Sequence, residues 1–442
     1  MGSKTGKGSM MWWQFSLLGV GCTIGTGFFL GSSIAIEKSG PAVLIPFFLA
    51  AIGTYIVYDA LVKMSIANPD KGSFRSYAKR AFGKWAGFSN GWVYLISEML
   101  IMGSQLMALG IFTQFWFPAL QLWIGTSIFA VLGLLIILTG IKGFEKFQNI
   151  FGVMKLAAIV MFIIVAVVIL SRGMTIQPSE VHSLFDTYKN FFSEGYRGLW
   201  LALLYAFYAY GGIEVMGLLI IDLKNPRQAP KAGKIMILVL TIIYVLSIAL
   251  ALVLVSWQEI KVEESPFITA LENFQLPYVT DIFNGILIIA GFSTMVASLY
   301  GVLTILTSLA EDHDAPAILV KKGEMRVPLP AFLFVAGALL TTIIIGFLLP
   351  EKIFEYMITA AGLMLLYNWL FILVTYTKLM QLSKWDRAKT TLGMLLIVIT
   401  VSGTFGEKTS RLGLFVSLLF LVIIGIVTCI MAKSWGSNKG SV

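Results

Sequence analysis

The sequence has few charged residues and few residues that carry catalytic or metal chemistry. Asp, Glu, Lys and Arg make up 12% of the 442 residues, roughly half the charged fraction of a soluble domain. It contains two histidines, His182 and His313, and two cysteines, Cys22 and Cys429. No cluster of His, Cys or carboxylate residues has catalytic or metal-ligand spacing, and no nucleotide-binding motif is present. We therefore expect no enzyme activity, no bound metal and no cofactor.

The sequence instead contains many long apolar runs. Hydrophobic residues make up 58% of the chain and the mean hydropathy is +0.87, which is too apolar for a soluble fold. A membrane-spanning helix needs about 20 apolar residues, and backbone exposed to lipid must satisfy its own hydrogen bonds. The sequence therefore predicts an all-α integral membrane protein embedded in a lipid bilayer. We expect twelve spans, at residues 11–37, 41–64, 86–116, 122–140, 148–171, 197–221, 234–256, 279–310, 328–349, 354–377, 389–405 and 411–431.

The distribution of basic residues predicts the orientation of these spans. The net charge of +9 does not indicate a nucleic acid partner, because basic residues of membrane proteins collect on cytoplasmic loops. With a cytoplasmic N-terminus, 23 of the 32 Lys and Arg residues lie on the cytoplasmic side and 8 on the outer side. We therefore expect a multi-pass protein of the plasma membrane whose tails, residues 1–10 and 432–442, are both cytoplasmic.

Two of the apolar runs are interrupted by glycine. The first contains GVGCTIGTGFF, Gly19 to Phe29, and the sixth contains YAFYAYGGIEVMG, Tyr205 to Gly217. Paired glycine interruptions at matching places in two halves point to an inverted-repeat transporter. Residues 11–171 and 197–377 would form the two five-helix repeats, and residues 389–431 would add the last two helices.

A helix broken at the membrane midplane offers both halves of a site for a zwitterion. The N–H end of one half attracts an anion and the carbonyl end of the other attracts a cation. An amino acid carries both charges on adjacent carbons. We expect its carboxylate near the amides of Gly25, Thr26 and Gly27, and its ammonium near the carbonyls of Thr23, Tyr208 and Gly211. The alternative is that the glycines only permit close packing of helices.

Four segments, taken in order along the chain, resemble one family. GVGCTIGTGFF resembles the first-helix signature of the amino acid–polyamine–organocation (APC) superfamily, and FYAYGGIE with the following Asp222–Ala232 segment resembles its sixth helix and the loop after it. Gly72–Trp92 resembles the loop between its helices 2 and 3, and Ser308–Pro316 resembles the end of its helix 8.

The resemblance implies a LeuT-like fold of five-plus-five inverted repeats and transport of amino acids or polyamines. It implies the same carboxylate and amine positions as above, and an outer-gate role for the aromatic ring of Tyr208. The chain departs from the family pattern at Leu303 and Thr304, where the family usually has Ser-Arg. This departure affects the contacts expected at an inner gate.

Charged residues within spans are functional candidates by default. Lys155 resembles a helix 5 lysine that, in some proton-coupled members, places its ammonium where sodium-coupled relatives hold a cation. A lysine removed from water can also shuttle a proton. The alternative is a lysine that snorkels to the interface. Glu214 would be either a protonatable coupling group or a fixed acceptor for N–H groups of the unwound turn.

Further polar residues complete the candidate site. Glu98 in the third span would face the substrate side chain, or else pair with another helix through Ser104 or Gln105. Three hydroxyl residues of the eighth span could line the cation position beside helix 1. They are Ser293, Thr294 and Ser298.

Together these features predict a secondary transporter of amino acids that works by alternating access, independent of sodium and coupled to protons. One alternative is an exchanger of amino acids or polyamines in which Glu98 selects a cationic substrate. Another is an amino acid sensor that keeps the fold without net flux.

Overall fold

The computed structural model describes residues 10–70, 72–139, 141–172, 191–274, 276, 278–320, 327–348 and 353–437. Their regular structure is helical, with one isolated β-bridge between Met10 and Leu223. Residues 1–9 and 438–442 of the expected tails lie outside this description, as does His182.

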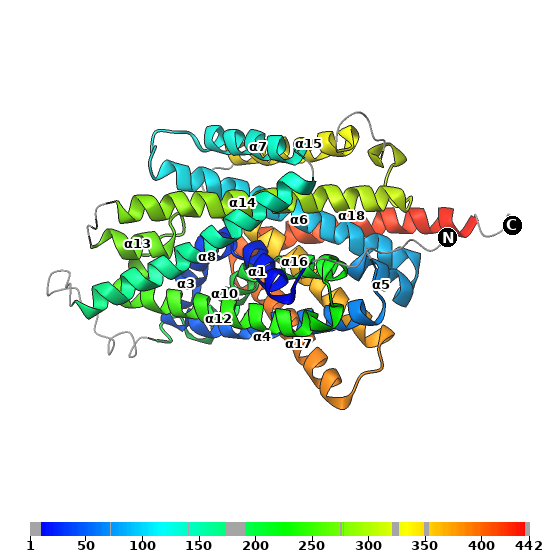
Figure 1. Cartoon of the computed structure of the whole chain (residues 1–442), viewed down its shortest axis with the longest axis horizontal. Helices are drawn as coiled ribbons and strands as arrows, with labels where there is room; N and C mark the ends of the chain where they lie inside the picture. Colours follow the sequence, from blue (N-terminus) through cyan, green and yellow to red (C-terminus); the bar gives the residue numbers. More distant parts are fainter. Residues whose placement is uncertain are drawn as a thin grey trace.

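The helices follow the predicted apolar runs closely (Figure 1). The first half of the chain forms α1 (Trp12–Thr23), α2 (Thr26–Phe29), α3 (Gly31–Ser39), α4 (Leu44–Ala67), α5 (Ser73–Phe82), α6 (Lys84–Gln114), α7 (Leu122–Leu138) and α8 (Ile141–Ser171). The second half forms α10 (Gly195–Ala209), α11 (Ile213–Leu219), α12 (Ala229–Leu254), α13 (Pro266–Glu272), α14 (Val279–Glu311), α15 (Leu329–Leu348), α16 (Ile353–Leu379), α17 (Lys384–Gly403) and α18 (Lys408–Ser437). Two short helices, α5 and α13, lie in loops where the hydropathy pattern predicts no span.

Ten helical stretches in the described residues are long and apolar enough to cross a membrane. One of them, Thr26–Ala67, has 42 residues, which at 1.5 Å per residue is about twice the ~30 Å bilayer core. It turns at Gly40, whose φ of 59° lies in the left-handed region, and at Pro41. The helix α7, with 17 residues, is shorter than a standard span. The count of twelve spans and the internal repeat therefore stay predictions.

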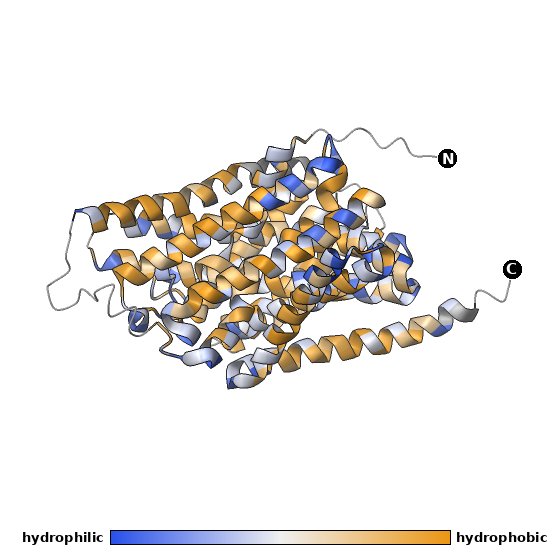
Figure 2. Ribbon diagram, turned by 90° about the horizontal axis from the view of Figure 1, so that it is seen from below, coloured by the Kyte–Doolittle hydropathy of each residue, from blue (hydrophilic) through white to orange (hydrophobic). Residues whose placement is uncertain are grey.

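Burial separates the inner helices from those that face the lipid. In the most apolar window of α16, 78% of the residues are buried, against 22% in α18. Apolar residues cover most of the helix surfaces, and polar residues gather toward the helix ends (Figure 2). This distribution is the one that a bilayer imposes, because apolar side chains gain nothing by leaving lipid while polar groups gain water at the ends.

The two broken spans run antiparallel to one another. The helix α1 packs against α11, whereas α2 and α3 pack against α10. At one end, the Met10 N–H donates to the carbonyl of Asp222 (3.1 Å), and the Lys224 N–H donates to the carbonyl of Met10 (2.9 Å). The first half of each broken span therefore lies beside the second half of the other, and the two breaks meet between them.

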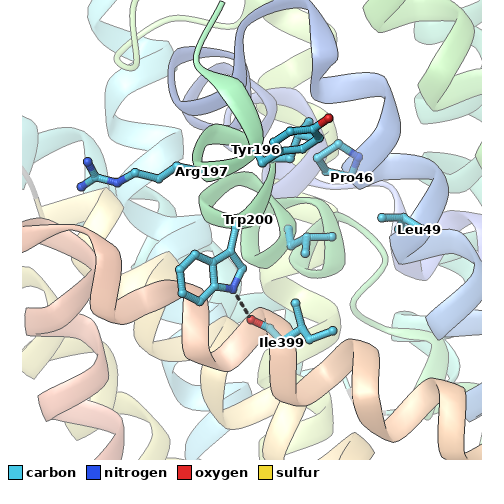
Figure 3. Close-up of a pocket in the computed structure, with 8 residues that line it drawn as sticks. Pro46, Leu49, Tyr196, Arg197, Trp200 and Ile399 are labelled. Atoms are coloured by element: carbon cyan, nitrogen blue, oxygen red, sulfur yellow. Dashed lines mark hydrogen bonds between the residues drawn. The ribbon is translucent and has the colours of Figure 1, made fainter. Parts of the chain in front are cut away.

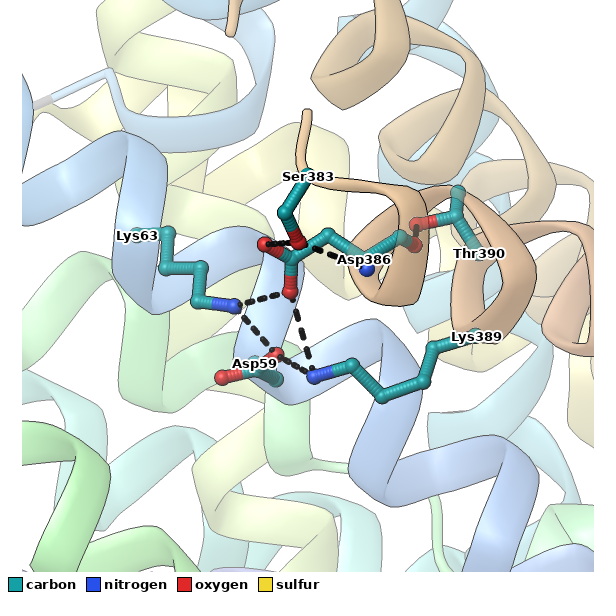
Figure 4. Close-up of polar contacts among 6 residues, drawn as sticks. All are labelled: Asp59, Lys63, Ser383, Asp386, Lys389 and Thr390. Carbon is teal, nitrogen blue, oxygen red and sulfur yellow. Dashed lines mark hydrogen bonds and ion pairs between the residues drawn. The ribbon is translucent and has the colours of Figure 1, made fainter. Parts of the chain in front are cut away.

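A charged network ties α4 to α17 (Figure 4). The Lys63 ammonium lies 2.9 Å from an Asp59 carboxylate oxygen and 2.7 Å from Asp386, and Lys389 lies 3.0 and 3.3 Å from the same two acids. The Ser383 hydroxyl accepts the Asp386 N–H (3.0 Å) and caps α17. Two cations and two anions balance one another, which supports a structural role for Asp59.

A second network lies at the opposite ends of the helices. The Lys38 ammonium of α3 is 2.5 Å from Glu407, 3.4 Å from Glu355 and 3.1 Å from Glu37. The Tyr205 hydroxyl of α10 lies 3.5 Å from the same Glu355. These contacts tie the end of the first broken span to α16 and to the turn before α18.

Candidate functional site

The predicted interruption of the first span is present. The helix α1 ends at Thr23, Ile24 is extended with φ −69° and ψ 114°, and Gly25 is extended with φ −157° and ψ −163°. The chain resumes as α2 at Thr26 and continues with little deviation through Leu30 into α3. Two extended residues are enough to separate the carbonyl end of α1 from the N–H end of α2.

The sixth span is interrupted as well, and here glycine is required. The helix α10 ends at Ala209, and α11 begins at Ile213. Between them Gly212 has φ 103°, a conformation that costs a residue with a side chain roughly 1–2 kcal/mol. The Gly211 N–H donates to the Tyr208 carbonyl (2.9 Å) and closes the turn.

The two breaks lie against one another without room for side chains. A Cβ atom added to Gly212 would lie 2.9 Å from the carbonyl oxygen of Cys22, and one added to Gly27 would lie 2.8 Å from the Tyr208 ring. The Tyr208 hydroxyl bonds to the Ser104 hydroxyl of α6 (2.7 Å). Glycine at these positions therefore lets two backbones and one aromatic ring approach closely.

The amide at the start of α2 already has an acceptor. The Thr26 N–H donates to the side-chain oxygen of Gln105 on α6 (3.2 Å), and the Thr26 hydroxyl donates to the same oxygen (2.5 Å). The Thr294 hydroxyl of α14 lies 2.9 Å from it. No acceptor for the amides of Gly25 and Gly27 is found among the residues that the structure describes.

The carbonyl end of α1 carries a cation from α8. The buried Lys155 ammonium donates to the Gly21 carbonyl (2.8 Å). Gly21 and Gly152 pack backbone to backbone, since a Cβ on Gly21 would lie 3.1 Å from the Cα of Gly152. This close approach lets the Lys155 side chain reach α1 from the next turn of α8.

The other predicted carbonyls are placed around this end. The Thr23 hydroxyl bonds back to the Gly19 carbonyl (2.9 Å), and the Tyr208 carbonyl accepts the Gly211 N–H. A Cβ on Gly212 would lie 3.6 Å from the Cα of Thr23, and one on Gly27 would lie 3.4 Å from the Tyr208 carbonyl oxygen, so Thr23 and the Tyr208–Gly212 turn lie at the meeting of the two breaks. The Tyr208 carbonyl already has one donor.

The Glu214 carboxylate accepts hydrogen bonds at the break of the sixth span. Its two oxygens accept the Gly212 N–H at 3.1 and 3.2 Å, and one of them also accepts the Trp369 indole N–H (3.1 Å). Glu214 is completely buried. The geometry matches the predicted fixed acceptor for loose N–H groups of the unwound turn.

Glu98 lies inside the same region on α6 and faces α14. Its side chain is buried, with Ser298 and Tyr94 beside the carboxyl, and a Cβ on Gly301 would lie 3.8 Å from it. Ser298 lies one helical turn from Thr294, which contacts the first break at Gly25. The structure thus gathers the three predicted intramembrane charges around the first break.

The suggested link from Glu98 through Ser104 or Gln105 is not made, because those side chains bond to Tyr208 and Thr26. Residues 98 and 105 share a helix face but lie about 10 Å apart along the axis.

The three hydroxyl residues of α14 are buried beside the site. A Cβ on Gly25 would lie 2.8 Å from the Thr294 methyl group, so Thr294 contacts the break directly. Ser298 lies beside Glu98, and Ser293 is completely buried one residue before Thr294. Within the described residues, no group of three or more His, Cys, Asp or Glu side chains could hold a metal ion.

Two segments that carry the family resemblance meet at the end of α14. The Arg75 guanidinium of α5 forms an ion pair with Asp312 at the end of α14, and lies 3.8 Å from Asp314. Burial raises the pKa of the Asp314 carboxyl, and the positive charge of Arg75 opposes that rise. Thr304, which stands where the resemblance implies an arginine, is exposed, and its hydroxyl donates to the Tyr300 carbonyl of its own helix (2.8 Å).

A groove of about 600 Å³ on the outside of the molecule is separate from the breaks (Figure 3). It lies between the starts of α4 and α10 and the end of α17, and its lining includes Pro46, Trp200 and Ile399. Ten residues separate Trp200 from the turn at Tyr210, which corresponds to about 15 Å of helix. This groove is therefore not the site at the breaks.

Gln105 and Trp369 are the contacts that sequence reasoning missed. The sequence pattern suggests Gln105 only as a partner for Glu98, and it gives no reason to single out Trp369. An amide side chain in the middle of a span is a usable signal, because polar groups at membrane depth need partners. A lone tryptophan in an apolar run gives no such signal.

Comparison with known proteins shows the family to which this chain belongs. The family model described as amino acid permease matches residues 14–437. The chain is 54% identical over 430 residues to the uncharacterized transporter YcgH of Bacillus subtilis (strain 168), covering 97% of this chain and 96% of that protein. It is 28% identical over 415 residues to the aromatic amino acid transport protein AroP of Escherichia coli (strain K12), covering 94% of this chain and 88% of that one. The chain is a multi-pass membrane protein that belongs to the amino acid permease family.

Proposed function

We propose that this permease is a secondary-active amino acid transporter that is independent of sodium and coupled to protons. It works by alternating access, with the substrate bound where α1–α2 and α10–α11 are unwound. The observation that carries the proposal is the meeting of two broken helices, one presenting amides at Gly25–Gly27 and the other ending in a glycine turn at Gly212.

The substrate main chain is recognised by peptide dipoles. Its carboxylate binds the N–H groups of Gly25, Thr26 and Gly27, because free amides at a helix start favour negative charge. Its ammonium binds the carbonyls of Thr23, Tyr208 and Gly211. Five of these six residues are buried and Gly211 is half-buried, and hydrogen bonds are strengthened away from water.

Lys155 supplies the cation that a sodium ion would otherwise supply. Its ammonium bonds to the freed Gly21 carbonyl, and lysine is a side chain that can release its proton when desolvated. Loss of that proton would free α1 to move, so that proton binding and helix position are linked.

Uptake by proteoliposomes tests the proposed function. Radiolabelled amino acids are supplied one at a time, with aromatic ones first because of the similarity to AroP. We expect accumulation driven by an inward pH gradient in buffers without sodium. Uptake that occurs only with amino acid preloaded inside would instead establish an exchanger, and binding without flux would establish a sensor.

We place both termini in the cytoplasm and the protein in the plasma membrane. The basic-residue distribution supports this orientation. Residue contacts support a shared end for the two termini: Met10 pairs with the segment after α11, and Trp435 near the end of α18 packs on Phe88 near the start of α6, with ring centroids 5.6 Å apart. Cysteine labelling from either side of the membrane distinguishes the two orientations.

Replacing Glu98 by glutamine is expected to change substrate selection. The carboxylate lies at the proposed side-chain pocket beside Ser298, and a hydrogen bond to a charged group contributes about 1.5–3 kcal/mol. We expect Glu98→Gln to lower the preference for basic over neutral amino acids by about tenfold or more, measured by competition for uptake. An unaltered preference would remove the proposed substrate role of Glu98.

Glutamine at position 214 is expected to support transport, because an acceptor oxygen remains for Gly212. We predict pH-driven uptake within about threefold of wild type for Glu214→Gln. Glu214→Leu leaves the Gly212 and Trp369 N–H groups without an acceptor, at about 1–3 kcal/mol each, and should lower the melting temperature. Loss of pH-driven uptake in Glu214→Gln, with substrate exchange intact, would instead make Glu214 the proton-carrying group.

A further inference from the structure

We propose that the side-chain oxygen of Gln105 occupies the carboxylate position of the amino acid site in this conformation, and that the substrate must displace it to bind. This inference rests on the proposed function. It makes Gln105 a competitor of the substrate carboxylate for the same hydrogen-bond donors.

Three donors converge on the Gln105 oxygen. They are the Thr26 N–H at 3.2 Å, the Thr26 hydroxyl at 2.5 Å and the Thr294 hydroxyl at 2.9 Å. A backbone N–H can only donate, so the Gln105 atom that faces it is the carbonyl oxygen and not the NH₂ group. All three residues are at least nine-tenths buried. The donors therefore form a closed cage around a single oxygen position.

Such a cage suits an anionic oxygen better than a neutral one. Hydrogen bonds to an ionised acceptor are roughly twice as strong as those between neutral groups. The Thr294 hydroxyl has only one proton, which in this structure is also within reach of the Ala290 and Gly291 carbonyls. A carboxylate would draw that proton fully toward the cage, whereas a neutral amide competes weakly for it.

Gln105 also gives the Thr26 N–H, one of the donors at the start of α2, an acceptor. A buried N–H without an acceptor costs about 1–3 kcal/mol, and Thr26 is completely buried. The amide oxygen of Gln105 satisfies that N–H when no substrate is present. An incoming carboxylate has to replace this contact, so part of its binding free energy is spent on displacing Gln105.

The exchange alters how the broken span is held. Gln105 lies on α6 and Thr294 on α14, and both contact the start of α2. With Gln105 bound, α2 is attached to α6 by the protein itself. With substrate bound, that attachment passes through the substrate, so occupancy of the site changes the link between the broken span and its neighbours.

Gln105→Leu tests the inference, because leucine has a similar volume and no oxygen. We expect a lower melting temperature for the ligand-free protein and a larger rise on adding substrate. The Kd of the amino acid should fall by about three- to tenfold, and net uptake at saturation should slow because product release is slower. The probe is the amino acid with the largest thermal shift among the twenty, compared with its decarboxylated amine (2-phenylethylamine in the case of phenylalanine), whose Kd should not change.

Asn284→Leu is the matched control. The buried Asn284 amide on α14 donates to the Phe112 carbonyl on α6 (2.9 Å), so the variant removes a polar tie between the same two helices at another level. It should lower the melting temperature without changing the substrate-induced shift.

An unchanged or higher Kd in Gln105→Leu, with wild-type binding intact, would overturn the competitor role and leave the transporter proposal standing. Equal tightening for the decarboxylated amine would also overturn it. Absence of binding of any amino acid by wild type and variant alike would overturn both.

Discussion

Replacing Lys155 by alanine is expected to reduce uptake driven by a pH gradient by about 100-fold. The ammonium forms a buried, charge-assisted bond with the Gly21 carbonyl, and such bonds contribute about 1.5–3 kcal/mol, with each 1.4 kcal/mol equal to a factor of ten. The variant also loses the group that we propose to carry the proton. Initial rates in proteoliposomes without sodium measure the effect.

Substrate exchange separates coupling from folding in this experiment. Exchange at equal pH on both sides needs no net proton movement, so Lys155→Ala should retain a larger share of exchange than of pH-driven uptake. Lys389→Ala is the control, because Lys389 is bound to Asp59 and Asp386 away from the breaks. Intact pH-driven uptake in Lys155→Ala would refute the coupling role.

Gly212→Ala is expected to reduce transport by roughly tenfold or more. The φ of 103° at this position strains any residue with a side chain, and the new Cβ would meet the Cys22 backbone at 2.9 Å. The Cys22 backbone cannot rotate out of the way as a flexible side chain could. The alanine would therefore force the two breaks apart. Backbone strain of about 1–3 kcal/mol predicts a loss of roughly tenfold or more in uptake, together with a lower melting temperature.

Gly337→Ala shows whether the effect belongs to the break. Gly337 lies within α15, and a Cβ added there would have nothing within 4 Å. Alanine is a better helix former than glycine, so this variant should transport like wild type. Wild-type uptake by Gly212→Ala would mean that the contact between the two breaks is not needed for transport.

Much of the fold could be predicted from the sequence because membrane helices are governed by local composition. Apolar runs near 20 residues predicted long helices that are present, although the count of twelve spans stays a prediction. The glycines of Gly19–Phe29 and Tyr205–Gly217 predicted the breaks, which are present at Ile24–Gly25 and Tyr210–Gly212. The short helices α5 and α13 were not predicted, because with 10 and 7 residues they are far shorter than the apolar runs used to find spans.

The hydrogen-bond partners of the site residues could be predicted only in part. For Glu214, acceptance of N–H groups from its own break was one of two roles left open, and its oxygens do accept the Gly212 N–H two residues away. Its second donor, Trp369, comes from α16 and could not be named. Ser104 and Gln105 are adjacent in sequence, yet their side chains bond to Tyr208 and Thr26, because successive residues of a helix point to different sides. Glu98 lies about 10 Å farther along the helix axis.

By itself, the sequence determined that the chain spans a membrane, where two of its helices break, and which side chains are charged at membrane depth. These properties follow from composition and backbone preference over a few residues. Only the tertiary structure decided that Lys155 meets Gly21 and that Gln105 caps Thr26, pairs 134 and 79 residues apart in the chain. Buried donors and acceptors must find partners, but which partner each finds depends on how the helices pack.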